Sequence, residues 1–228
     1  DASANTITFN VTSVNDAPTG ADNTITSLED AIYTFSAADF GFADAADSPA
    51  NALLAVKITT LATAGTLKLS GTNVTLGQVI TAANIPNLTF TPAANANGTG
   101  YASFTFQVQD DGGTSNGGVN EDASANTITF NVTSVNDAPA GANNTLTFLE
   151  DAIYTFFAAD FGFADAADSP ANAFTAVKIT TLATAGTLKL SGTNVTLGQV
   201  ITVANIPNLT FTPVAGANGT GYATFTFQ

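Results

Sequence analysis

The sequence predicts an all-β protein made of tandem Greek-key β-sandwich modules with about seven strands each. First, residues 1–107 align without a gap on residues 122–228, and only eleven of the 107 aligned pairs differ. Second, short segments alternate apolar and polar residues, which is the period-two pattern of half-buried strands. Third, 19 Gly and 8 Pro interrupt the chain too often for long helices. The chain therefore contains two copies of one sandwich module.

The individual strands are expected where the alternation is clearest. In residues 6–12, Ile7, Phe9 and Val11 share one face of an extended chain, and Thr and Asn occupy the other. A helical turn is expected near residues 81–84, and Gly and Pro supply the turns between strands. The remaining strands are expected at residues 31–35, 53–59, 66–69, 88–91 and 102–108, and all but the last recur 121 residues later.

The module boundaries are expected at a repeated pentapeptide, Val-Asn-Asp-Ala-Pro, which occupies residues 14–18 and 135–139. Its proline forces extended backbone between two strands. If modules start near Ala17 and Ala138, residues 1–16 are the final strand and linker of a preceding module. Residues 17–137 are then a complete module, and residues 138–228 are a second module that lacks its final strand.

The missing strand makes the second module marginal. Burying each Ile, Phe or Val side chain contributes roughly 1.5 to 3 kcal/mol, whereas a whole domain is stable by about 5 to 15 kcal/mol. Because residues 1–14 carry the strand in question, one hypothesis is strand complementation between chains in a head-to-tail homopolymer. The alternative is that the sequence is a piece cut from a continuous array of repeats.

Composition excludes several classes of function. The chain has no Cys, Met, Trp or His, so thiol nucleophiles, imidazole bases and the usual zinc ligands are missing, and we expect no enzyme activity. Four basic against 18 acidic residues give a net charge of -14, which repels nucleic acid and attracts divalent cations. No apolar run approaches the roughly 20 residues of a membrane span.

A resemblance to a known family rests on three segments: YASFTFQVQDDG at residues 101–112, ITFNV at residues 128–132, and VNDAP at residues 135–139. Together they resemble the end of a cadherin-type repeat, and more closely the cadherin-like tandem repeats of large bacterial surface adhesins and biofilm matrix proteins. The resemblance implies a cadherin-like or Ig-like sandwich on the cell surface, extracellular, with neighbouring repeats of the same protein as partners. It also implies an extender stiffened by Ca²⁺ at the module junctions.

The same resemblance implies metal ligands, since calcium takes six to eight oxygen atoms, several of them from carboxylates. Ser13 and Ser134 stand where the family often has a further acid, so we expect fewer ions per junction. The alternative for each carboxylate is simple solvation. The first junction is expected to use Asn15, Asp16, Asp44, Asp47 and Asp110, and the second to use Glu29, Asn136, Asp137, Asp165 and Asp168.

A second function remains open at this point: an adhesive module that binds carbohydrate or protein. Phe40 and Phe42, with their copies Phe161 and Phe163, flank glycine and form either an exposed aromatic patch or a plug at the sandwich end. The near identity of the two copies favours the extender, because a binding tip is usually a single divergent domain.

Overall fold

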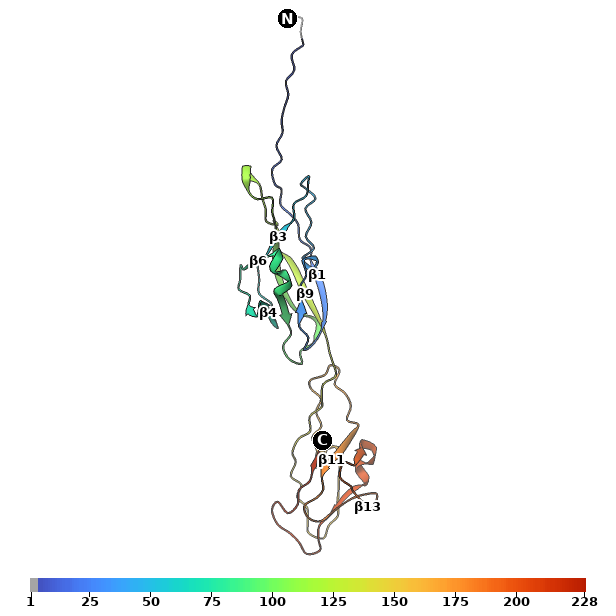
Figure 1. Cartoon of the computed structure of the whole chain (residues 1–228). Helices are drawn as coiled ribbons and strands as arrows, with labels where there is room; N and C mark the ends of the chain where they lie inside the picture. The colour runs from blue at the N-terminus through green and yellow to red at the C-terminus, as the bar shows by residue number, and fades with distance from the viewer. Residues whose placement is uncertain (1–3) are drawn as a thin grey trace. The chain divides into compact units, whose positions relative to one another are not determined.

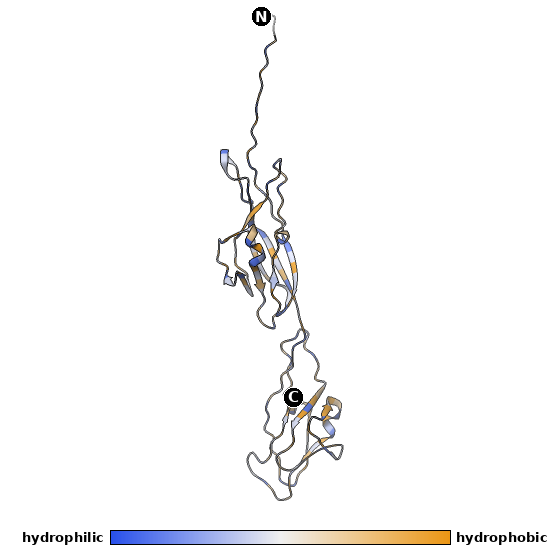
Figure 2. Ribbon diagram, viewed as in Figure 1, coloured by the Kyte–Doolittle hydropathy of each residue, from blue (hydrophilic) through white to orange (hydrophobic). Residues whose placement is uncertain are grey.

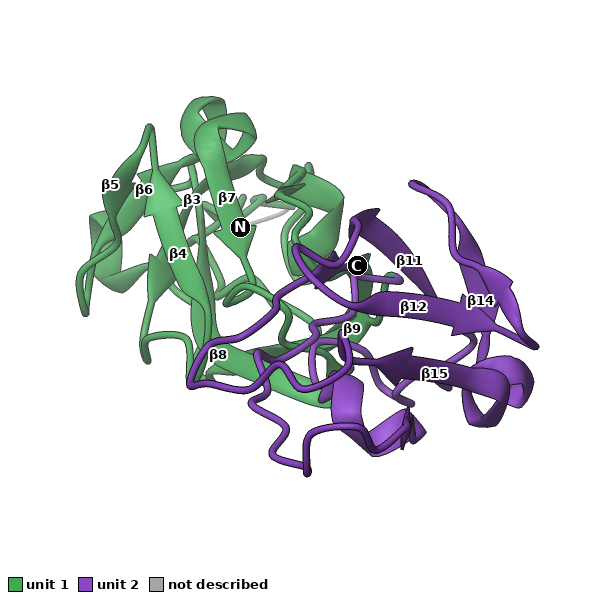
Figure 3. Ribbon diagram, turned by 90° about the horizontal axis from the view of Figure 1, so that it is seen from below, with its two compact units in different colours: residues 1–135 green, residues 136–228 purple. Residues whose placement is uncertain are grey.

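The computed structural model describes residues 4–228 and divides the chain into two compact units, residues 1–135 and 136–228 (Figure 3). Both units are built from strands joined by turns and short 3-10 helices. Hydrophobic and hydrophilic residues are interspersed along the strands (Figure 2), as expected when one face of each strand packs on a core. The predicted all-β sandwich fold is confirmed.

The first sheet of unit 1 has five strands in the order β1-β9-β8-β3-β6 (Figure 1). Strand β9 lies between β1 and β8; it runs parallel to β1 and antiparallel to β8. Strand β8 then pairs antiparallel with β3, and β3 with β6. The strands are β1 (Asn23–Leu28), β3 (Leu53–Ile58), β6 (Val79–Thr81), β8 (Gly98–Asp110) and β9 (Asn126–Thr133).

The second sheet of unit 1 has the order β2-β7-β4-β5, and all its pairs are antiparallel. Its strands are β2 (Tyr33–Thr34), β4 (Thr66–Leu69), β5 (Thr72–Asn73) and β7 (Leu88–Thr91). The core lies between the two sheets, where Phe90 of β7 stacks on Phe130 of β9 with ring centroids 3.8 Å apart. This contact shows why β9 is central to the packing of unit 1.

The described part of unit 1 has nine strands where the sequence predicted about seven. Strands β1, β5 and β6 were not predicted, since two of them are only two or three residues long. Three short 3-10 helices complete the unit: η1 (Ala37–Phe40), η2 (Ala82–Asn87) and η3 (Ser115–Gly117). Helix η2 confirms the helical turn predicted near residues 81–84.

Unit 2 repeats much of this architecture. One sheet has the order β14-β11-β16 and the other the order β10-β15-β12-β13. Residues 136–228 contain no strand that corresponds to β1 or β9. The elements are β10 (Tyr154–Thr155), η4 (Ala158–Phe161), β11 (Ala176–Thr181), β12 (Thr187–Leu190), β13 (Thr193–Asn194), β14 (Val200–Thr202), η5 (Val203–Asn208), β15 (Leu209–Thr212) and β16 (Thr226–Phe227).

The strand predicted at residues 6–12 is not formed in the structure. Residues 4–12 are extended without a sheet partner (Figure 1), and Ile7, Phe9 and Val11 are 80%, 84% and 94% exposed. The physical reason is that a strand needs a neighbour to take its backbone hydrogen bonds. Residues 1–3 of the same predicted segment lie outside the described residues.

The aromatic residues beside the glycines belong to the interior. Phe40 and Phe161 are 0% and 2% exposed, and Phe42 packs against the core of unit 1. Phe163 stacks on Phe174 with ring centroids 5.0 Å apart. These rings therefore close one end of each sandwich.

Candidate metal centre

Three loops meet at one end of unit 1 and carry the predicted ligands. Asp110 is the last residue of β8, and Asp44 and Asp47 lie in the loop between η1 and β3. Reciprocal backbone hydrogen bonds of 2.8 Å between Thr19 and Ala43 hold the linker against that loop. The linker residues just before Thr19 are thereby placed beside the acidic loop.

The linker side chains and backbone bind directly to the loop acids. Asn15 Nδ2 donates to Asp110 Oδ1 at 3.0 Å and to the Val119 carbonyl oxygen at 2.7 Å. The backbone N–H of Asp16 donates to Asp47 Oδ2 at 3.0 Å. The structure therefore brings four of the predicted residues together in two pairs, Asn15 with Asp110 and Asp16 with Asp47.

Sequence reasoning missed Asn51, which joins the two pairs. Asn51 Nδ2 donates to Asn15 Oδ1 and, at 3.1 Å, to Asp47 Oδ2. Its backbone N–H donates to Asp44 Oδ2 at 2.5 Å. Asn51 lies in the same loop as Asp44 and Asp47, and Asn172 is its copy in unit 2, but nothing in the sequence pattern marks it as a partner of Asn15. We define Asn15, Asp16, Asp44, Asp47, Asn51 and Asp110 as the acidic cluster of unit 1.

Two carboxylate oxygens of this cluster are buried without a hydrogen-bond partner, Asp44 Oδ1 and Asp110 Oδ2. Their residues are 8% and 0% exposed. A buried carboxylate oxygen that lacks a donor is costly unless a cation compensates its charge. Among residues 4–228, the one Lys–carboxylate ion pair is Lys57 with Glu121, so no basic side chain pairs with these two acids.

A glycine lets the linker approach the end of β8. The Gly112 N–H donates to Asp110 Oδ1 at 2.9 Å. A Cβ atom at Gly112 would meet the ends of the Asn15 and Asn51 side chains. A larger residue in the Asp-Asp-Gly turn would therefore push these two amides out of their present positions in the cluster.

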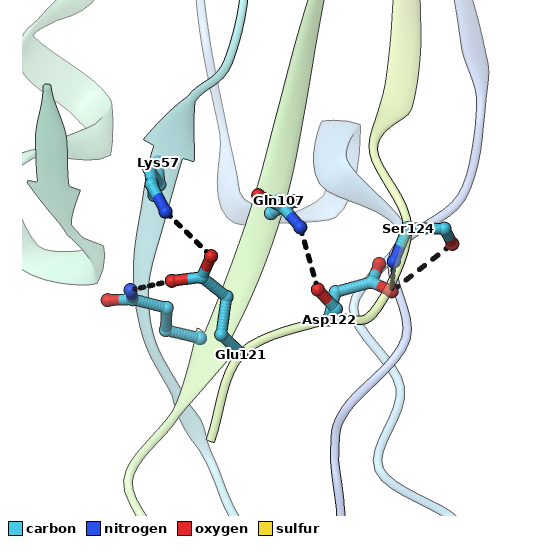
Figure 4. Close-up of polar contacts among 6 residues, drawn as sticks. Lys57, Gln107, Glu121, Asp122 and Ser124 are labelled. Carbon is cyan, nitrogen blue, oxygen red and sulfur yellow. Dashed lines mark hydrogen bonds and ion pairs between the residues drawn. The ribbon is translucent and has the colours of Figure 1, made fainter. Parts of the chain in front are cut away.

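Polar contacts of Glu121 and Asp122 fasten the loop between β8 and β9 (Figure 4). The same loop carries the Val119 carbonyl oxygen. Lys57 Nζ lies 2.7 Å from Glu121 Oε1, and the Gln107 side chain donates to the Asp122 carbonyl oxygen at 2.8 Å. The hydrogen bond from Lys57 lowers the pKa of Glu121 below its usual value of 4.5. These contacts hold the loop so that its carbonyl oxygen faces the cluster.

Part of this arrangement recurs in unit 2, where Asn172 takes the place of Asn51. Asn172 Nδ2 donates to Asn136 Oδ1 at 2.8 Å and to Asp168 Oδ2 at 2.7 Å. The Asp137 N–H donates to Asp168 Oδ1 at 2.8 Å, and the Asn172 N–H to Asp165 Oδ2 at 2.6 Å. Asp165 is 7% exposed and its Oδ1 has no hydrogen-bond partner.

Glu29 lies apart from the acidic cluster of unit 1. Glu29 directly follows β1. Because Leu28 and Gly98 both pair with the last residues of β9, Glu29 lies near Gly98, at the end of β8 opposite to Asp110. Its carboxylate accepts hydrogen bonds from Val135 N at 2.5 Å, Ser134 Oγ at 3.0 Å and Asn97 Nδ2 at 2.9 Å. Glu29 is 2% exposed, and its role as a ligand at the second junction stays a prediction.

The carboxylates of the acidic cluster of unit 1 are spread out, whereas Asp137 and Asp168 of unit 2 bring carboxylate oxygens within 4.8 Å of each other. Among the described residues of either unit taken alone, no three carboxylates place oxygen atoms within 4.8 Å of one another. Calcium–oxygen bonds of 2.3 to 2.6 Å require ligand oxygens within about 5 Å. The amide of Asn51 stands between Asn15 Oδ1 and Asp47 Oδ2, so a cation that binds both oxygens has to displace it.

The fold and the repeat define the class of this protein as an all-β, Ig-like sandwich repeat. The family model described as "Bacterial Ig domain" matches residues 15–133, more than half of the chain. The chain belongs to this family of bacterial Ig-like domains, which are structural rather than enzymatic and are typically exposed at the cell surface. No curated protein and no solved structure shows significant similarity to the chain.

No helix in the described part of the chain is long and apolar enough to cross a membrane.

Proposed function

We propose that the chain is an extracellular extender of a bacterial adhesin or matrix fibre, of the cadherin-like kind, stiffened by Ca²⁺ bound at its acidic clusters. The observation that carries the proposal is the pair of unpartnered, buried carboxylate oxygens on Asp44 and Asp110, with a third on Asp165 in the second copy. Charged oxygens that are buried and unpaired are sites for a cation.

The chemistry of the cluster matches a hard divalent cation. Asp and Asn side chains and the Val119 carbonyl offer oxygen atoms only, which calcium prefers over nitrogen or sulfur donors. The chain offers no His or Cys for a transition metal. A net charge of -14 raises the local concentration of divalent cations around such a site.

Stiffening follows from where the ligands lie in the chain. Asn15 and Asp16 belong to the linker, whereas Asp44 and Asp110 belong to the sandwich. A cation that binds both groups holds the linker on the module and removes its freedom to rotate. The strand-rich repeat then transmits tension along a more extended chain.

The proposal includes assembly. Neighbouring repeats of the same protein are its partners, and copies of the chain join head to tail by strand complementation. The exposed strand sequence at residues 5–12 supports this part, since the same sequence at residues 126–133 is a buried strand.

Calcium titration tests the cation site. The unfolding midpoint of the 228-residue chain is measured by calorimetry in EDTA and in calcium. A calcium concentration 100-fold above the dissociation constant is expected to stabilise the folded chain by about 2.7 kcal/mol. Asp44→Asn and Asp110→Asn, which keep shape but remove charge, are expected to abolish the shift in unit 1.

Asp30→Asn is the matched control, because it removes one charge from an exposed turn outside the cluster. It is expected to keep the calcium shift. If calcium leaves the midpoint of the unaltered chain unchanged, or if Asp30→Asn and Asp110→Asn reduce the shift equally, the acids are merely solvated and the cation site is refuted.

A further inference from the structure

The dipeptide Asn-Gly occurs twice in unit 1, as Asn97–Gly98 and as Asn116–Gly117. This dipeptide is prone to deamidation, because glycine has no Cβ atom to hinder its backbone nitrogen from reaching the side-chain carbonyl carbon of the preceding asparagine. The reaction also needs rotation of the backbone between the two residues. Both pairs have the same chemistry, so the surroundings of each pair decide whether it reacts.

Asn116 lies at the tip of the loop between β8 and β9, which projects from the end of the first sheet (Figure 1). Asn116 and Gly117 are exposed, and helix η3, which contains them, is a single turn with no buried residue. A short turn without buried contacts opens at little cost in free energy. The tip therefore has the freedom that the reaction requires.

The conformation of the tip also favours the reaction. Asn116 has a left-handed backbone with a φ of 58°, and Gly117 follows with a φ of 87°. A Cβ atom at Gly117 would meet no atom within 4 Å beyond its chain neighbours. The Asn116 side chain makes no hydrogen bond within residues 4–228, so its carbonyl carbon is free to turn toward the Gly117 nitrogen.

Asn97 is held by its surroundings. Its side chain is half-buried, and its Nδ2 donates to Oε2 of Glu29 at 2.9 Å. Gly98 is the first residue of β8 and pairs with Val132 of β9. Rotation between Asn97 and Gly98 has to break a hydrogen bond to a buried carboxylate and detach the start of β8. The fold therefore protects this pair.

The base of the loop that carries Asn116 is also fixed. Its Asp111–Gly112 pair isomerises through the same attack by a glycine nitrogen. However, the Gly112 N–H donates to Asp110 Oδ1 at 2.9 Å. Asp111 Oδ1 accepts from the Ala52 N–H at 2.8 Å, and the Asp111 N–H donates to the Ala52 carbonyl oxygen at 3.1 Å. Backbone freedom in this loop is therefore confined to the tip.

We propose that Asn116 is a site of spontaneous deamidation in folded unit 1, whereas Asn97 is protected by its contacts with Glu29 and β9. The Gly117 nitrogen bonds to Cγ of Asn116, the Cγ–Nδ2 bond breaks, and ammonia leaves with the proton of the Gly117 N–H. Water then opens the succinimide ring. Opening at the side-chain carbonyl gives aspartate, opening at the main-chain carbonyl gives isoaspartate, and water is the one co-reactant.

The modified tip belongs to the loop that contacts the linker. Two residues beyond Gly117, the Val119 N–H donates to the Asn15 carbonyl oxygen at 2.9 Å, and Asn15 Nδ2 donates to the Val119 carbonyl oxygen at 2.7 Å. Deamidation adds one negative charge to this loop, and isoaspartate also adds a methylene group to its main chain. The inference goes beyond the proposed function and depends neither on a bound cation nor on assembly.

Peptide mapping by mass spectrometry tests the site. The 228-residue chain is incubated in EDTA at mildly alkaline pH, with a parallel sample in strong denaturant, and both are digested on the N-terminal side of Asp at several times. In the folded chain, Asn116 is expected to convert at least about tenfold faster than Asn97. In denaturant, which removes the contacts of both residues, the two are expected to convert at similar rates.

The products are assigned peptide by peptide. Conversion is read as the mass gain of an amide that becomes a carboxylate, and fragmentation identifies isoaspartate at each position. Asn218–Gly219 of unit 2 lies in a separate peptide and does not enter the comparison. An Asn116 that stays intact in the folded chain while it converts in denaturant overturns the proposal, because the fold then protects the tip. Equal rates for Asn116 and Asn97 in the folded chain overturn it as well.

A matched pair of variants gives an independent measurement. Asn116→Gln and Asn97→Gln each keep an amide, but the longer side chain forms the corresponding ring far more slowly. In the folded chain, Asn116→Gln is expected to remove nearly all the isoaspartate of unit 1, and Asn97→Gln is expected to remove almost none. In denaturant, each variant is expected to remove about half. Equal losses from the two variants in the folded chain contradict a reactive tip beside a protected Asn97.

Discussion

One octapeptide occurs twice in this protein and adopts two different states. At residues 126–133 it is β9, paired on both sides and buried. At residues 5–12 it carries no strand, and its apolar side chains are exposed. The amino acids are identical, so the difference lies in the presence of neighbours. A strand in this protein is stabilised by pairing and burial rather than by intrinsic preference.

The neighbours of this octapeptide also differ between the units. Beside β9, residues 23–28 form β1 and residues 98–110 form the 13-residue strand β8. In unit 2, residues 144–149 and 219–228 align with these segments, and they contain only the two-residue strand β16. Regular structure in these segments therefore accompanies pairing with β9.

The largest expected effect comes from truncating the same phenylalanine in the two states. Phe130→Ala removes a ring that is 0% exposed and stacked on Phe90, and it is expected to destabilise unit 1 by about 3 to 5 kcal/mol. Phe9→Ala, the same change in the exposed copy, is expected to change the stability of the monomer by less than about 0.5 kcal/mol. Calorimetry at low protein concentration measures both.

A comparable loss in both variants contradicts the comparison, because it means that residues 5–12 already pack within the monomer. Equal insensitivity contradicts it from the other side, since Phe130 then contributes nothing to the core despite its burial.

The repeat and the alternation of apolar and polar residues predicted most of the strands. The sequence located β3, β4, β7 and β8 because their alternation is regular and their ends are marked by Gly or Pro. It missed β1, whose residues 23–28 contain two apolar side chains among Thr, Ser and Asn and become a strand through pairing with β9. Local pattern indicates the face of a strand, but the partner decides whether the strand forms.

The candidate site was only partly accessible from sequence. The linker and loop acids Asp16, Asp44 and Asp47 were identified through the family resemblance, and the structure places them around Asn51. No spacing rule predicts that an amide holds the centre of the cluster, because its contacts span 36 residues of chain. The role of Glu29 at the second junction stays a prediction; within unit 1 its carboxylate accepts hydrogen bonds from Asn97 and Val135.

The next prediction exchanges Ser27 and Phe148, which occupy the same position in the two units. Ser27 faces the interior next to Val132 of β9, so Ser27→Phe overfills unit 1 and is expected to destabilise it by about 1 to 3 kcal/mol. The reverse change, Phe148→Ser, removes a ring that contacts Tyr154 and Phe211. It is expected to lower the stability of unit 2 by about 1 to 3 kcal/mol.

Chemical denaturation measures the stability of both variants. If Phe148→Ser leaves the stability of unit 2 unchanged, the ring contributes nothing to the packing despite its contacts with Tyr154 and Phe211. If Ser27→Phe leaves unit 1 unchanged, that position has room for a ring in both units.

The smallest expected effect concerns an ion pair that distinguishes the units. Lys57 pairs with Glu121 in unit 1, whereas its copy, Lys178, makes no ion pair within residues 4–228. The folded-state pKa of Glu121 lies below its usual value of 4.5, so its contribution is present above about pH 4.5 and is lost as pH falls through the lowered pKa. Because both side chains are about one-third exposed, solvent screening limits this contribution to about 1 kcal/mol or less.

Glu121→Gln isolates the contribution of the Lys57–Glu121 ion pair to stability, because the amide keeps the shape of the side chain but cannot titrate. Comparing the unaltered chain with Glu121→Gln at pH 7 and at pH 3, we expect the small stability gap between them to close at the acidic pH. Lys57→Ala is expected to produce the same pH-dependent gap, and Lys178→Ala is expected to produce none. A gap that persists at pH 3 assigns the effect to packing of the loop between β8 and β9, and the charge then plays no part in the difference between the units.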